Sequence, residues 1–137
     1  MPSGLSELVL IVDDVAAGVR FYRDLLGLTL EKPATDDWAW FLLDAARPTQ
    51  RLALATGPLL FEEHSPKPDG HRFGNVHFAI QVTADEWSEI KARLSAAGID
   101  TFGPTHFDWM AATGHYCYDP AGNLVELWIP DSPEATA

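Results

Sequence analysis

The 137-residue chain has little of several residue types, and each shortage excludes a class of protein. Cys117 is the single cysteine, so an internal disulfide is excluded and a reducing compartment is expected. Only 9 Lys and Arg stand against 20 Asp and Glu, which argues against a nucleic-acid partner because phosphate binding needs clustered basic residues. No apolar run approaches the roughly 20 residues of a membrane span, and no basic stretch precedes an apolar one at the N-terminus. We expect a soluble cytoplasmic domain without a membrane partner.

The apolar pattern of the first half predicts one helix among four strands. Residues 7–12 (ELVLIV) form a nearly continuous apolar run, which is typical of a strand. A helix is predicted over residues 13–27, with Asp13 or Asp14 as N-cap and Gly27 at its C-terminal end. Its buried stripe should consist of Val15, Val19, Tyr22 and Leu26. Three further strand-like segments follow at 28–32, 38–44 and 51–56.

The second half repeats the same order. Residues 75–82 (NVHFAIQV) indicate a strand, and Thr83 and Glu86 have the spacing of a capping box that begins a helix. Its buried stripe should be Trp87, Ile90 and Leu94, and Gly98 should end it. Strand-like segments follow at 99–103, 110–119 and 123–129, and residues 106–110 (HFDWM) are expected in a loop.

Both halves therefore read β-α-β-β-β, which is the pattern of an internal repeat. We predict an α+β fold of two βαβββ modules that form a half-open, cleft-bearing mixed sheet within one domain. The first module covers about residues 5–56 and the second about 75–130. Residues 57–74 are rich in Pro and Gly and should form a linker, and the tail 131–137 should be disordered.

Glu126 is the most unexpected residue, because it interrupts an apolar run in YCYDPAGNLVELW (116–128). A buried carboxylate is costly unless it is paired, protonated or bound to a cation. Strand alternation places Glu7, His77 and Glu126 each on the less apolar face of its strand. Packing of the modules about a two-fold axis would bring the three together as a divalent-metal site.

These elements resemble the vicinal oxygen chelate superfamily, which includes glyoxalase I, extradiol dioxygenases, fosfomycin-resistance enzymes and bleomycin-resistance proteins. The similarity rests on VDDVAAGVRFYRDLLGL, NVHFAIQV and DPAGNLVEL, and covers about residues 5 to 130. It implies a glyoxalase-like fold, a homodimer, and metal ligands at Glu7, His77 and Glu126. Two departures stand out. The first-strand ligand is usually His or Gln rather than Glu7, and Ala53 or Ala55 occupies the position of the fourth ligand of glyoxalase I.

Each candidate also has a plainer interpretation. His77 and Glu126 would pair with each other in a metal-free site, and Glu7 would be a solvated carboxylate. Cys117 is most simply a small buried residue. The direction of His115 depends on a strand register that the sequence does not settle. Aromatic residues near the predicted cleft, which are core or the walls of a ligand pocket, are Trp40, Trp109, Phe107 and Tyr116.

Two functions follow from the resemblance. The first is a metal-dependent enzyme, a lyase, isomerase or dioxygenase, that acts on a small oxygen-bearing metabolite or xenobiotic. Its Mn, Zn, Ni or Fe ion would act as a Lewis acid, and Glu7 and Glu126 would also serve catalysis. The second is a metal-free protein that confers bleomycin-type antibiotic resistance by sequestering the drug. The net charge of −11 suits a cationic drug.

Overall fold

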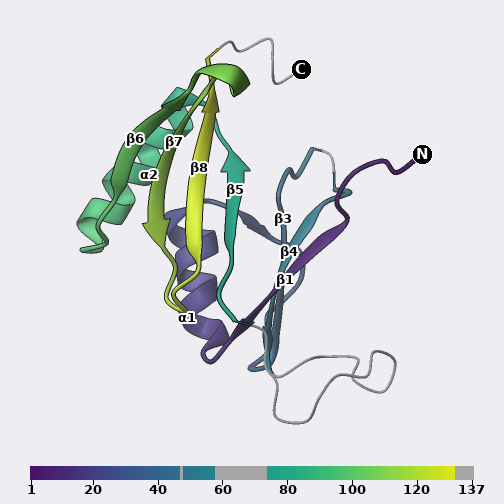
Figure 1. Cartoon of the computed structure of the whole chain (residues 1–137). Helices are drawn as coiled ribbons and strands as arrows, with labels where there is room; N and C mark the ends of the chain where they lie inside the picture. The colour runs from purple at the N-terminus through teal and green to yellow at the C-terminus, as the bar shows by residue number, and fades with distance from the viewer. Residues whose placement is uncertain (47, 58–73, 132–137) are drawn as a thin grey trace. The chain divides into compact units, whose positions relative to one another are not determined.

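The computed structural model describes residues 1–46, 48–57 and 74–131, which belong to two compact units, Met1–Asn75 and Val76–Ala137 (Figure 1). Most of the predicted linker and all but the first residue of the predicted tail lie outside the described residues. Within the described ranges, no helix has the length and apolar character that a membrane crossing requires.

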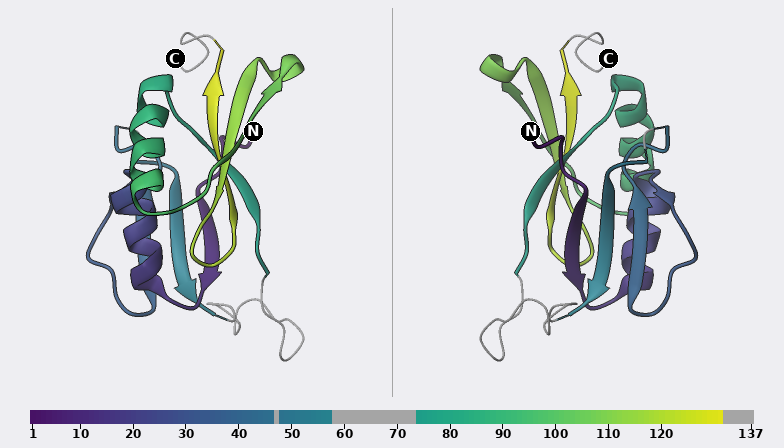
Figure 2. Two further views of the ribbon diagram at one scale, coloured as in Figure 1. Left: turned by 90° about the vertical axis from the view of Figure 1, so that its left-hand side faces the viewer. Right: turned by 90° about the vertical axis from the view of Figure 1, so that its right-hand side faces the viewer.

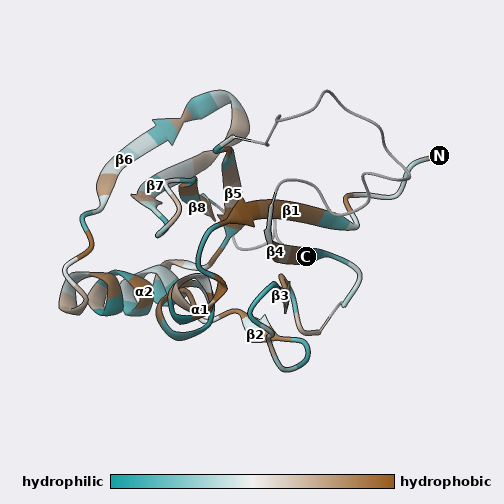
Figure 3. Cartoon of the chain, turned by 90° about the horizontal axis from the view of Figure 1, so that it is seen from below, coloured by the Kyte–Doolittle hydropathy of each residue, from teal (hydrophilic) through white to brown (hydrophobic). Residues whose placement is uncertain are grey.

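The first unit has the predicted β-α-β-β-β order. Its sheet runs β1-β4-β3-β2, with β1 parallel to β4 and the other pairs antiparallel. Figure 3 shows that β1 is hydrophobic over most of its length. The predicted strand at 28–32 is shorter than expected, because only two of its residues pair with β3. The elements are β1 (Glu7–Val12), α1 (Val15–Val19), the π-helical η1 (Arg20–Leu25), β2 (Thr29–Leu30), β3 (Trp38–Leu42) and β4 (Arg51–Thr56).

The helical segment of this unit is not the single α-helix that the sequence predicts. It begins as expected at Asp14, whose Oδ1 accepts a hydrogen bond of 3.0 Å from the Ala17 N–H. After one α-helical turn the chain widens into the π-helix η1, and Gly27 follows at a φ of 82°. The predicted stripe Val15, Val19, Tyr22 and Leu26 is buried throughout. The amphipathic pattern was therefore right, and the helix type was wrong.

The second unit repeats the order with a regular helix. Its sheet runs β5-β8-β7-β6, with β5 parallel to β8. The predicted capping box is present at Thr83 and Glu86, and the Trp87 ring stacks on His115 of β7 at 4.4 Å between centroids, which places the helix against this sheet. The elements are β5 (His77–Gln81), α2 (Ala84–Ala96), β6 (Phe102–Phe107), the 3-10 turn η2 (Asp108–Met110), β7 (Ala112–Tyr118) and β8 (Leu124–Pro130).

Two predicted segments of this unit differ from the structure. Residues 106–110 are not simply a loop, because β6 continues to Phe107 and pairs with β7 up to Ala112. The η2 turn then closes the β6–β7 hairpin, whose tip is visible in Figure 2. The predicted strand at 99–103 begins only at Phe102.

The hairpin signature DPAGN has a structural role. Asp119 Oδ1 accepts hydrogen bonds from the Ala121 and Asn123 N–H groups at 3.0 and 2.8 Å. Asn123 donates through Nδ2 to Asp119 and accepts from the Val76 N–H at 2.9 Å. Both polar side chains are nearly inaccessible, so these bonds fasten the β7–β8 turn to the chain that enters β5.

The registers show that the two units are built alike. Glu7 pairs with Arg51 across the parallel strands of the first unit, as His77 pairs with Leu124 in the second. Ala53 accordingly occupies the place of Glu126. Two mixed four-stranded sheets with few helices confirm the predicted α+β architecture.

Candidate functional site

Two of the predicted site residues, His77 and Glu126, contact each other in the second unit. The two residues start from neighbouring parallel strands, and His77 Nε2 lies 3.0 Å from Glu126 Oε1. The Glu126 side chain is 6% exposed, whereas the His77 side chain is 53% exposed. The site therefore presents an imidazole to solvent above a carboxylate that is almost completely buried.

The second oxygen of this carboxylate is the unusual atom. Glu126 Oε2 is buried and has no hydrogen-bond partner among the residues that the structure describes. Such an oxygen is destabilising unless a proton or a cation compensates it, since burial removes its hydration. The fold thus places a buried acceptor oxygen, close to the Tyr116 side chain, at the centre of the candidate site.

Tyr116 borders the same carboxylate from β7, where it is the direct cross-strand neighbour of Glu126. Its ring centroid lies 6.1 Å from that of His77. Burial, the nearby Glu126 charge and a side-chain interaction with the Glu126 carboxylate raise the pKa of the Tyr116 phenol, against a hydrogen bond with Thr105 that lowers it. The phenol consequently remains protonated at neutral pH beside the carboxylate.

An aromatic pair flanks this polar group. Phe107 stacks on Trp128 with ring centroids 5.5 Å apart and an interplanar angle of 18°. Trp128 lies two residues beyond Glu126 on β8, so the two side chains share a face of the sheet. The predicted wall residue Phe107 is thus in an aromatic cluster of this unit. Trp128 was missed as a wall residue, although its spacing from Glu126 could have revealed it.

The other predicted aromatics lie elsewhere. Trp109 is on η2 with 83% of its surface exposed. Trp40 is in the first unit, where it stacks on Trp38 at 4.8 Å and has the Lys32 ammonium 4.5 Å from its ring centroid. Its indole N–H donates to Glu7 Oε1 at 3.1 Å. The exposed Glu7 carboxylate is therefore held on the sheet surface by an indole.

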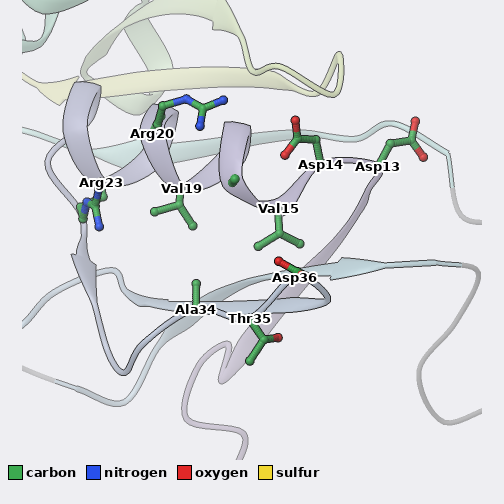
Figure 4. A pocket seen from close by; sticks show the side chains of 10 residues that line it. Asp13, Asp14, Val15, Val19, Arg20, Arg23, Ala34, Thr35 and Asp36 are labelled. Carbon is green, nitrogen blue, oxygen red and sulfur yellow. The ribbon is translucent and has the colours of Figure 1, made fainter.

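The first unit also has a cavity of about 590 Å³, shown in Figure 4. It lies between the start of α1 and residues 34–36, with Asp14, Arg20 and Asp36 among its lining residues. None of the predicted site residues borders it. The cavity and the predicted site are therefore different places.

Two remaining residues have defined environments. Cys117 is buried in β7, and burial, with a smaller contribution from the Asp119 charge, raises the pKa of its thiol to about 12. It is a small core residue, as expected, because a nucleophilic cysteine needs a lowered pKa. His115 faces Trp87 on α2, and burial, followed by the Lys91 charge, lowers its pKa.

Within the described residues, no group of three or more His, Cys, Asp and Glu side chains is arranged to hold a metal ion. The structure brings His77 and Glu126 together in the second unit, while Glu7 belongs to the first. Glu7 as third ligand remains a prediction.

The comparisons with known proteins agree with this architecture. The family model of the Glyoxalase/Bleomycin resistance protein/Dioxygenase superfamily matches residues 4–127. The chain belongs to this superfamily. A comparison with curated proteins returned no match.

Among solved structures, a lactoylglutathione lyase from Agrobacterium tumefaciens is 27% identical, with a TM-score of 0.71 over 95% of this chain and 96% of that one. The fosfomycin resistance protein FosX from Listeria monocytogenes, complexed with Mn(II) and sulfate, is 22% identical, with a TM-score of 0.66 over 98% and 94%. The antibiotic binding protein TnmS3 from Streptomyces sp. CB03234 is 20% identical, with a TM-score of 0.65 over 94% and 97%. The last two likenesses concern the fold alone.

Proposed function

We propose that this superfamily member is a divalent-metal-dependent enzyme that acts on a small oxygen-bearing metabolite or xenobiotic. The observation that carries the proposal is the buried Glu126 carboxylate, one oxygen of which has no hydrogen-bond partner among the described residues. The imidazole of His77 lies beside it. A cation is the ligand that would compensate this oxygen while using both side chains.

The donor chemistry fits such an ion. Imidazole and carboxylate together suit Mn, Zn, Ni or Fe(II). His77 Nε2 and the Glu126 carboxylate are close enough, with Nε2 3.0 Å from Oε1, that both side chains would hold one ion. When bound, the ion would supply Lewis acidity to oxygen atoms of the substrate.

The chain's own residues have separate tasks in this proposal. His77 is half exposed and offers Nε2 at the accessible side of the site, where a substrate can approach. Glu126 supplies buried negative charge, and the protonated Tyr116 beside it offers a hydroxyl to a substrate oxygen. Glu7, oriented by the Trp40 indole, is the proposed third ligand and proton acceptor.

Metal titration tests the proposal. Chelator-treated protein should bind about one equivalent of Mn(II), Zn(II), Ni(II) or Fe(II) in calorimetry. His77→Ala should weaken binding most, and Glu126→Gln should weaken it while preserving the fold. Glu89→Gln, which neutralises an exposed carboxylate on α2, is the matched control and should bind normally. Unchanged binding by Glu7→Gln would make Glu7 a bystander.

A second candidate function has its own supporting observation. The Trp40 ring, which stacks on Trp38, already has a cation over its face, the Lys32 ammonium, and the chain has a net charge of −11. A metal-free protein that sequesters a cationic antibiotic would use these features. The absence of titratable heat with all four metals, together with tryptophan fluorescence quenching by a bleomycin-type drug, would favour this function.

We also propose that the protein works as a homodimer, as the superfamily resemblance implies. Sedimentation should then give twice the 15.1 kDa mass of one chain. A single 15.1 kDa species at micromolar concentration would contradict the dimer without affecting the metal proposal.

A further inference from the structure

Gly114 on β7 lies directly against the Glu126 carboxylate. A Cβ added to Gly114 would overlap Glu126 Oε2 and would come within 3.0 Å of Cδ and 3.1 Å of the Tyr116 hydroxyl. No real Cβ tolerates the first of these contacts. The carboxylate therefore occupies the space that any side chain at position 114 would fill.

The backbone gives no other reason for glycine at this position. The glycines with positive φ include Gly27, Gly98 and Gly122, and Gly114 is not among them. Glycine inside a strand is otherwise unfavourable, because it loses more conformational entropy than other residues and has no side chain to pack. What requires glycine here is the space beside Glu126.

The first unit supplies an internal comparison. Trp38 is the register equivalent of Gly114, since it pairs with Ala55 as Gly114 pairs with Trp128. Ala53 correspondingly replaces Glu126. Where the sheet carries no carboxylate, the position equivalent to Gly114 is filled by the largest side chain.

We propose that Gly114 is a positioning residue of the candidate site. Its missing side chain allows Glu126 to lie back against β7, with Oε1 toward His77 and Oε2 without a protein donor among the described residues. The free oxygen is thereby kept for a ligand that brings a positive charge. The positioning role of Gly114 is argued from these contacts. That the ligand is a divalent cation rests on the proposed function.

A double-mutant cycle separates this role from a general packing defect. Gly114→Ala should lower the Tm of the metal-free protein, and Glu126→Asp, which shortens the side chain by one methylene, should remove most of that loss in the double variant. Gly74→Ala is the matched control, because an added Cβ there meets nothing within 4 Å. A loss from Gly114→Ala that is equal in the wild-type and Glu126→Asp backgrounds would overturn the proposal. If Gly114→Ala alone does not fold, folding of the double variant supports the proposal, and failure of both overturns it.

Two further measurements read the site itself. In metal-free protein, the ring ¹⁵N resonances of His77 should shift in Gly114→Ala but not in Gly74→Ala. In titrations with Mn(II), Gly114→Ala should lose about 10- to 100-fold in affinity, as is usual when a supporting residue of a metal site is altered. Wild-type affinity and an unmoved His77 spectrum in Gly114→Ala would overturn the proposal. Absence of Mn(II) binding by the wild type, with the His77 shift present, would instead contradict the metal function alone.

Discussion

The two units of this chain share a topology and a strand register, but they present different surfaces on the face that carries Glu7 and His77. In the first unit, Trp38 and Trp40 stand opposite Ala55 and Ala53. In the second, Gly114 and Tyr116 stand opposite Trp128 and Glu126. The tryptophan of the first pair is Trp38 on β3, opposite Ala55 on β4. At the equivalent pair of the second unit the tryptophan is Trp128 on β8, opposite Gly114 on β7.

This difference shows how one backbone plan accommodates either a stacked indole pair or a buried carboxylate. In the pairs Trp38–Ala55 and Gly114–Trp128 a large side chain lies opposite a small one, so both sheets fill this position with different chemistry. Glu126 has the His77 imidazole at one oxygen and the space left by Gly114 at the other. In the first unit, the carboxylate Glu7 stays at the exposed end of its strand.

The two sheets also differ on their other face, which is buried. A substitution there should have the largest effect on the free energy of unfolding. Phe41 and Cys117 are register equivalents, both fully buried, but Phe41 packs 5.8 Å from the Tyr22 ring. Phe41→Ala should lower the free energy of unfolding by about 3–5 kcal/mol, and Cys117→Ala by about 1 kcal/mol, because the first leaves a far larger cavity. Urea unfolding measures both, and equal losses would contradict the assignment of these two cores.

Moving the carboxylate to the first unit tests the comparison directly. Ala53 is fully buried, and the described part of its unit contains no histidine that could pair with a carboxylate at this position. Ala53→Glu should lower the free energy of unfolding by about 3 kcal/mol, because it buries an unpaired charge. Ala53→Gln is the control for size, and its loss should not depend on pH. If the Glu variant is not less stable at pH 7 than the Gln variant, the first sheet tolerates a charge as well as the second.

The helices allow a smaller comparison. Thr83 Oγ1 accepts a 3.1 Å hydrogen bond from the Glu86 N–H, and the Glu86 carboxylate accepts one of 2.8 Å from the Thr83 N–H. Thr83→Ala should cost about 1 kcal/mol in thermal or urea unfolding, whereas Thr83→Ser keeps the acceptor and should cost much less. Equal losses in the two variants would mean that the cap is not the cause.

The sequence predicted these features unequally. The order of elements, the capping box and the buried stripes could be predicted, because each is a local pattern of polar and apolar residues. The π-helix after Val19 could not, since its amphipathic stripe is compatible with an α-helix. Residues 106–110 were misplaced because β6 pairs with β7, and pairing partners are not local.

The candidate site was predicted only in part. Glu126 stood out as a charge in an apolar run, and His77 followed from the repeat. Their contact is in the structure, whereas their roles as ligands stay predictions. Gly114 was missed, although a glycine inside a predicted strand is itself a signal of close approach. What depends on cross-strand register, including the direction of His115, required coordinates.

The smallest effect concerns pH, and it belongs to the second unit, which contains every described histidine. His106 Nε2 lies 2.9 Å from Asp131 and Nδ1 lies 2.7 Å from Asp108. Hydrogen bonds to Asp131 and then Asp108 raise the pKa of His106 above 6.5. A raised folded pKa means that this contribution to stability is fully present below the unfolded pKa and is lost as pH rises through the folded one.

His106→Gln should therefore cost more stability at pH 6 than at pH 9. His115 acts in the opposite direction, because burial lowers its pKa, so its contribution is present above pH 6.5 and is lost as pH falls through the folded value. The pH dependence of wild-type stability therefore contains both contributions. The contribution of His106 is obtained from the difference in stability between the wild type and His106→Gln at each pH. NMR titration should show that Asp131→Asn lowers the His106 pKa more than Asp108→Asn does. If His106→Gln loses the same stability at pH 6 and at pH 9, the two carboxylates do not hold the imidazole in its charged form.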